Sequence, residues 1–145
     1  MSGPNQALPM RYIAILAFIF TPLLAWAELP PEKPNTVLIH PGEELYARFE
    51  ESGTALKLAS VSKEKDAQAQ LIVKMDPFDK VEKMLILKVE SKFKQTMLYK
   101  AEMRLLSKNR RQETSVVPVL AGLSSYEEWP HPIEELALYG FTLKP

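Results

Sequence analysis

The sequence contains no cysteine, and it has only 5 glycines and 2 histidines among its 145 residues. Without cysteine the chain has no disulfide, thiolate metal site or thiol nucleophile, and no lipid attachment through an N-terminal cysteine. No glycine-rich loop motif is present, which excludes a phosphate-binding loop. A His-Glu-x-x-His motif, an acid-rich calcium loop and a cluster of histidines are also missing. The folded chain must therefore be stabilised by packing.

An apolar run close to the N-terminus is the clearest feature that is present. Residues 12–24 are mostly apolar, Arg11 precedes them, and Ala25-Trp26-Ala27 follows. These are the three parts of a secretory signal peptide. A membrane anchor is disfavoured because the run is shorter than the roughly 20 residues of a span and contains Pro22. We expect residues 1–27 to be removed on export.

The absence of cysteine also bears on location. Exported domains of this size in animals commonly use disulfides, so a cysteine-free chain is easier to place in a bacterial periplasm. Secretion from the cell is the alternative. After cleavage we expect no stable membrane span and, because the chain is exported, no nucleic-acid partner.

Residues 28–145 are near the commonest size for one domain. Prolines 30, 31 and 34 predict that residues 28–36 form an extended, unpaired segment, since proline removes backbone donors. Residues 37–145 are then expected to form a single domain.

Apolar residues in this domain recur with a period of two, which is typical of strands. The clearest example runs from Met97 to Leu105, where charged residues alternate with apolar ones. The same pattern is found over 44–50, 56–59, 71–75, 85–93 and 136–143. The sequence Glu51-Ser52-Gly53 predicts a hairpin turn, and Gly140 is expected to form a bulge where the alternation slips by one residue. Pro118 confines the run over 116–120 to a sheet edge, a bulge or a strand end.

Seven or eight strands at intervals of about ten residues, with no long helix, favour an all-β antiparallel fold. An immunoglobulin-like sandwich is the first interpretation. A small closed β-barrel is the alternative, because one sequence does not give the strand order.

The segment over 122–132 departs from the strand pattern, and we expect a binding site there. Ser124 with Glu127, and Ser125 with Glu128, have capping-box spacing, which predicts one helical turn before Pro130. The aromatic rings of this segment either plug the end of the domain or face outward as anchors for a partner. The candidate binding residues are Tyr126, Glu127, Glu128, Trp129 and His131.

The middle of the chain is basic, with 14 Lys and Arg against 7 Asp and Glu over 57–111. Such a segment can bind anionic envelope polymers, or it can simply be a solvated face. The candidate basic surface consists of Lys92, Lys94, Lys100 and Arg104.

Catalytic and metal chemistry have little support. A zinc site needs His40 and His131 to converge with a carboxylate, and nothing in their spacing forces this. The Gly-x-Ser-x-Gly nucleophile motif is missing because Tyr126 stands at its second glycine position. We therefore expect no metal and no cofactor.

The favoured hypothesis is an exported, non-catalytic binding or accessory protein. It would present a sheet edge or the segment 122–132 to a periplasmic or envelope protein. One alternative is a small cell-wall hydrolase that uses Glu127, Glu128 and His131. The other is an electrostatic binder of anionic envelope polymers through the basic segment.

Overall fold

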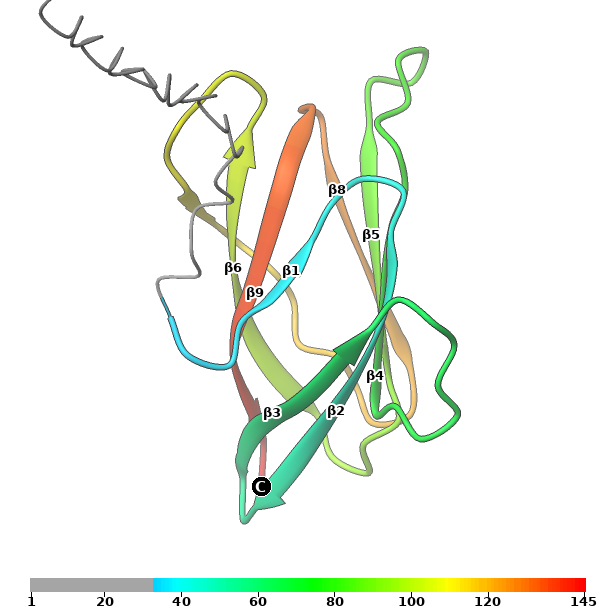
Figure 1. Ribbon diagram of the computed structural model, residues 1–145, viewed down its shortest axis with the longest axis vertical. Helices are drawn as coiled ribbons and strands as arrows, with labels where there is room; N and C mark the ends of the chain where they lie inside the picture. The colour runs from blue at the N-terminus through cyan, green and yellow to red at the C-terminus, as the bar shows by residue number, and fades with distance from the viewer. Residues whose placement is uncertain (1–32) are drawn as a thin grey trace, which may run out of the picture. The chain divides into compact units, whose positions relative to one another are not determined.

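The alternating residues fold into nine strands within residues 33–145, the part of the chain that the computed structural model describes (Figure 1). The strands are β1 (Val37–Ile39), β2 (Glu44–Ser52), β3 (Ala55–Ser62), β4 (Leu71–Met75), β5 (Leu85–Ser91), β6 (Met97–Leu105), β7 (Gln112–Thr114), β8 (Ser124–Trp129) and β9 (Ile133–Leu143). No helix occurs among these residues. The predicted signal peptide, residues 1–27, lies outside them.

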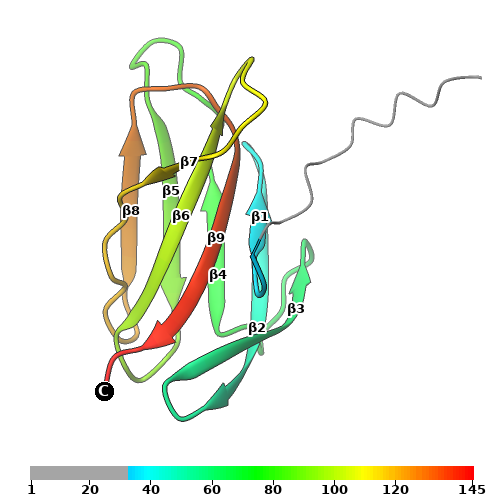
Figure 2. The same ribbon diagram turned by 90° about the vertical axis from the view of Figure 1, so that its left-hand side faces the viewer.

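All strand neighbours are antiparallel, in the order β7-β6-β9-β3-β2-β4-β5-β8, with β1 also paired to β9. The two halves of this sheet meet through one residue pair, Ala55 with Thr142. The sheet curls into a half-barrel, so β7 and β8 come to the same side of the molecule (Figure 2). Trp129 Nε1 donates a hydrogen bond of 2.8 Å to Thr114 Oγ1 across that side. The all-β antiparallel prediction is confirmed, whereas separation into the two layers of a sandwich is not.

The concave face of the curled sheet holds the core. The largest fully buried apolar side chains are Ile39, Leu71, Met75, Leu85, Leu87, Met97, Leu136 and Leu138. At one end of the core Phe49 packs edge-on against Phe93 and Phe141, and Tyr99 stacks on Phe141. Each large apolar side chain buried in this way contributes about 1.5–3 kcal/mol, so packing can stabilise the chain without crosslinks.

Two of the predicted turn features are present. β2 and β3 form a hairpin, although β2 continues through Ser52 and the turn itself is at Gly53 and Thr54. Gly140 has a φ of +65°, and the β6–β9 register shifts beside it. A left-handed conformation of this kind favours glycine, because a Cβ would crowd the backbone.

The predicted helical turn in 122–132 is wrong, because residues Ser124–Trp129 form strand β8. Pairing with β5 provides hydrogen-bond partners for the backbone groups that a capping box would have satisfied. Ser125 and Trp129 are buried, which determines which side chains of the strand face the core. The run over 116–120 is not a strand either. It makes only an isolated bridge between Val119 and Met97.

The described end of the proline-rich segment is attached to the sheet. Lys33 Nζ donates hydrogen bonds to Glu102 and to the Tyr139 hydroxyl, and it lies 4.2 Å from the centre of the Tyr139 ring. The hydrogen bonds that Lys33 donates to Glu102 and Tyr139 raise the pKa of Lys33. Residues 33–36 are thereby held against β6 and β9.

Candidate functional site

The segment in which the sequence predicts a site is strand β8, and β8 is one end of the strand order. Ser125 and Trp129 point inward and are buried, and Glu127 is half-buried between them. The other three residues, Ser124, Tyr126 and Glu128, are exposed. Tyr126 is 60% exposed. Of the two aromatic residues in the strand, Trp129 therefore faces the core and Tyr126 faces the surface.

The backbone of β8 is paired on one side only. In β5, Ile86 accepts a hydrogen bond from Asp76 on the β4 side. The amide and carbonyl of successive residues in a strand point to opposite sides, so those of Leu85, Leu87 and Val89 point toward β8 instead. Their partners in β8, such as Glu127, use the bonds to β5. The amides and carbonyls of Ser124, Tyr126 and Glu128 therefore point away from β5.

The end of β7 and the segment that follows it lie beside β8, and side chains of β8 contact both. The amide of Val117 donates a 2.6 Å hydrogen bond to Glu127 Oε1, and Thr114 accepts the hydrogen bond from Trp129. Within residues 33–145 no backbone-to-backbone hydrogen bond joins residues 115–119 to β8. The backbone edge of β8 thus remains unpaired.

Several exposed apolar side chains occur in β8 and in the residues just before it. Val117, Leu120, Leu123 and Tyr126 are each at least half exposed. A single exposed apolar residue is ordinary, whereas several near an unpaired strand are typical of surfaces that bind a partner.

Two hydroxyl groups are buried beneath β8. Tyr99 Oη and Ser125 Oγ have no hydrogen-bond partner among the described residues. Burial raises the pKa of Tyr99, and the nearby charge of Glu127 adds to the shift. Ser125 lies close enough to oppose the shift, but it does not reach hydrogen-bond geometry. The hydroxyl of Tyr99 is therefore held neutral inside the fold.

The proposed hydrolase residues are not assembled. Glu127 and Glu128 point to opposite faces of β8, and His131 is exposed in the turn before β9. In the described part of the chain no hydrogen bond or ion pair joins His131 to either glutamate. His40 instead contacts other carboxylates, and no three side chains in residues 33–145 gather as a metal site.

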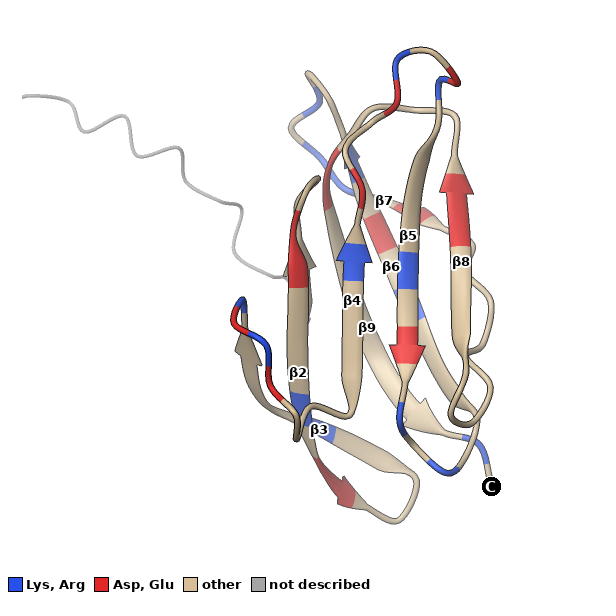
Figure 3. Ribbon diagram, turned by 90° about the vertical axis from the view of Figure 1, so that its right-hand side faces the viewer, with Lys and Arg blue, Asp and Glu red and all other residues tan. Residues whose placement is uncertain are grey.

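The four candidate basic residues lie in different surroundings. Lys92 and Lys94 flank the buried Phe93 and line a surface hollow of about 470 Å³. Lys100 lines a second hollow, of about 300 Å³, together with Tyr139. Arg104 is engaged in ion pairs. Figure 3 shows acidic and basic residues on β2 and on β5, a basic residue on β4 and acidic residues on β8.

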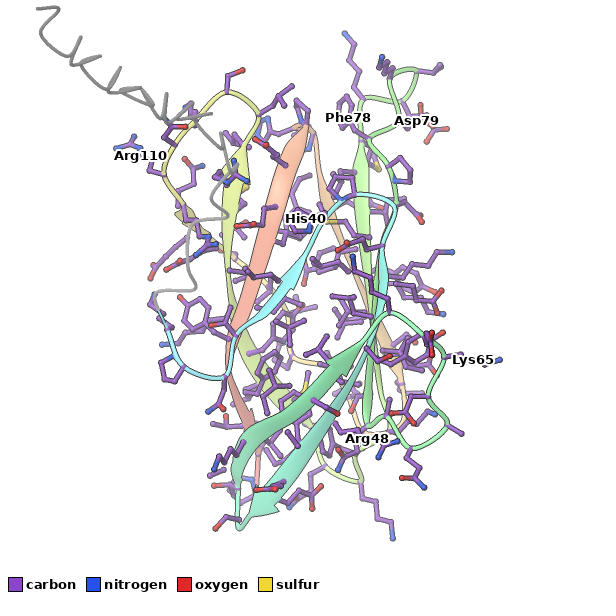
Figure 4. The ribbon with its side chains drawn as sticks, in the orientation of Figure 1. His40, Arg48, Lys65, Phe78, Asp79 and Arg110 are labelled. Atoms are coloured by element: carbon purple, nitrogen blue, oxygen red, sulfur yellow. The ribbon has the colours of Figure 1, made fainter. Side chains whose placement is uncertain are left out.

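A buried ionic cluster is the feature that the sequence did not predict. Glu135 in β9 is fully buried, and its Oε1 accepts hydrogen bonds from Arg111 Nε at 3.1 Å and Nη2 at 2.5 Å. Its Oε2 lies 3.2 Å from His40 Nε2 and 3.9 Å from Arg104 Nη2. Figure 4 labels His40 beside β9. We call Glu135, Arg111, Arg104 and His40 the Glu135 cluster. It ties β1, β6 and the β6–β7 connection to β9.

Glu43 extends this cluster toward the surface and gives it an acid-sensitive contact. Burial opposes ionisation of Glu43, but hydrogen bonds from the His40 amide, Lys63 and the His40 ring outweigh it and lower the pKa of Glu43 from its ordinary 4.5. A lowered folded-state pKa stabilises the fold fully above pH 4.5, and this contribution is lost as the pH falls through the folded value.

We therefore expect Glu43→Gln to reduce the free energy of unfolding at neutral pH by at most about 1 kcal/mol, since the carboxylate is partly exposed. Urea denaturation of both proteins across the acid range measures this difference. The two curves should converge below pH 4.5. A difference that does not change with pH would contradict the assignment.

Comparison of the chain with family models, curated proteins and solved structures gave no match. What the protein does is therefore inferred from its own side chains and backbone. Over residues 33–145 no helix has the length and apolar character that crossing a bilayer requires.

Proposed function

We propose that this protein is an exported, non-catalytic binding protein that adds a strand of a protein partner to the open edge of β8. The unpaired backbone of Ser124, Tyr126 and Glu128 is the observation that carries the proposal. In strand addition the main chain supplies affinity, and alternate side chains supply specificity. Tyr126, with its exposed ring, is the anchor residue.

The sequence offered two alternative presentations, a sheet edge or the segment 122–132. In the folded chain these are the same element, because β8 lies within that segment and ends the strand order. Tyr126 is proposed as the anchor in preference to Trp129, because the indole of Trp129 is buried and donates its hydrogen bond to Thr114.

Two finer points belong to the same proposal. Export to the periplasm rests on the predicted signal peptide over 1–27. An immunoglobulin-like sandwich remains the proposed description of the fold: β2, β4, β5 and β8 would form one layer, and β1, β9, β6 and β7 the other. The single β3–β9 pair that joins the two halves supports this division.

The proposal predicts that Tyr126→Pro strongly weakens partner binding. Proline removes the outward amide that a partner strand needs, yet it is tolerated where an edge amide faces solvent. We expect binding to fall at least about 30-fold, which corresponds to about 2 kcal/mol. A photo-crosslinking side chain at Ser124, introduced into the exported protein with and without Tyr126→Pro, measures this in cells.

Val81, which is 91% exposed in the β4–β5 connection, provides the matched control position. A crosslinker at Val81 should capture none of the adducts formed at Ser124. Equal adducts from both positions, or adducts that survive Tyr126→Pro, would show that the β8 edge is not the binding surface.

A further inference from the structure

The residues of β8 are self-complementary about Tyr126. The strand reads Ser124-Ser125-Tyr126-Glu127-Glu128, with hydroxyl residues before the tyrosine and carboxylates after it. We propose, on the basis of the proposed function, that the partner strand is β8 of a second copy of this chain. The two strands run antiparallel about a two-fold axis at Tyr126.

Antiparallel pairing about Tyr126 places each carboxylate opposite a hydroxyl. On the exposed face, Ser124 of one copy lies opposite Glu128 of the other. Ser125 lies opposite Glu127 on the core-facing side, where Ser125 is buried and Glu127 accepts the hydrogen bond from Val117, so this pair adds nothing to the contact. The two Tyr126 residues face each other. Aromatic pairs and hydroxyl–carboxylate pairs across strands are favourable, whereas like charges directly opposite are not.

Neighbouring registers are worse. An axis at Glu127 places the two Glu127 carboxylates opposite each other and puts Tyr126 opposite Glu128. An axis at Ser125 leaves Glu128 opposite Gly122, outside the strand. Charge and side-chain type therefore select one register from the three.

The backbone supports the same register. Ser124, Tyr126 and Glu128 all direct their amides and carbonyls outward, and reversal about Tyr126 pairs these three residues only with one another. In an antiparallel ladder such directly bonded pairs exchange two hydrogen bonds each. A closed two-fold dimer also covers both open edges at once, which removes the usual hazard of an exposed edge strand.

The cysteine-free sequence permits a direct test of the register in the purified protein. Residues in a bonded antiparallel pair have Cα atoms about 5.5 Å apart, within disulfide range. Tyr126→Cys should therefore form a covalent dimer under mild oxidation. Glu128→Cys should not, because its two copies lie about 13 Å apart along the strands. A mixture of Ser124→Cys and Glu128→Cys should crosslink as a heterodimer.

Val81→Cys controls for random collision between exposed thiols. Tyr126→Cys crosslinking at least about tenfold faster than Val81→Cys, with the mixed Ser124 and Glu128 pair, supports the dimer. Equal rates at Tyr126 and Val81, together with a monomeric mass for the wild type in sedimentation, overturn it. If adducts to another protein still depend on Tyr126 in cells, the proposed function stands without the dimer. If they do not, both fail.

Discussion

Glu135→Ala is expected to lower the free energy of unfolding by about 3–5 kcal/mol, which is a large share of the stability of a domain of this size. The carboxylate of Glu135 is fully buried, and the Arg111 side chain bonded to it is only 5% exposed. Removing the acid takes away the carboxylate to which the Arg111 guanidinium donates two hydrogen bonds, and so breaks a buried ion pair. Urea denaturation at neutral pH measures the loss.

Glu134 provides a matched control because it is the adjacent acid and also contacts Arg104. Its carboxylate is 37% exposed, so Glu134→Ala should cost less than about 1 kcal/mol. A double replacement, Glu135→Leu with Arg111→Leu, should lose less stability than Glu135→Ala, because it removes both buried charges. If Glu135→Ala and Glu134→Ala cost the same, the Glu135 cluster is not shielded from water.

The Glu135 cluster shows why part of this structure could not be predicted from the sequence. Arg111 is 24 residues from Glu135, and His40 is 95 residues away. A pattern of alternation identifies β9 but does not show which charges the sheet order brings to it. The position of Glu135 within a largely apolar run was the only local signal of an acid that needs partners.

The strands show where local pattern was sufficient. In β4 and β6 every second residue is apolar and most of the residues between them are charged, and both strands occur where predicted. β8 was missed because Ser124 to Glu128 resembles the start of a helix, and its strand conformation depends on pairing with β5. The three-residue strands β1 and β7 are too short to show any period. Local pattern therefore predicted the all-β class, and long-range pairing decided the edge on which the proposed site depends.

Trp129→Ala should be the second large loss, about 3–5 kcal/mol, because it removes a buried aromatic side chain from the core. It also removes the hydrogen bond to Thr114 that joins β8 to the end of β7. Trp129→Phe keeps most of the ring and loses this bond, so it should cost less, on the order of 1 kcal/mol from the bond itself. Thermal or urea unfolding of the two variants separates packing from hydrogen bonding.

Tyr126→Ala on the same strand is the decisive comparison. Its ring is exposed, so its loss should change the free energy of unfolding by less than about 0.5 kcal/mol while weakening partner binding. Trp129→Phe should behave in the opposite way, with reduced stability and unchanged binding by the folded protein. The two aromatic residues thus divide the roles of β8, since one faces the core and the other faces the partner. A stable Trp129→Ala protein that no longer binds would reverse this assignment and make the indole the anchor.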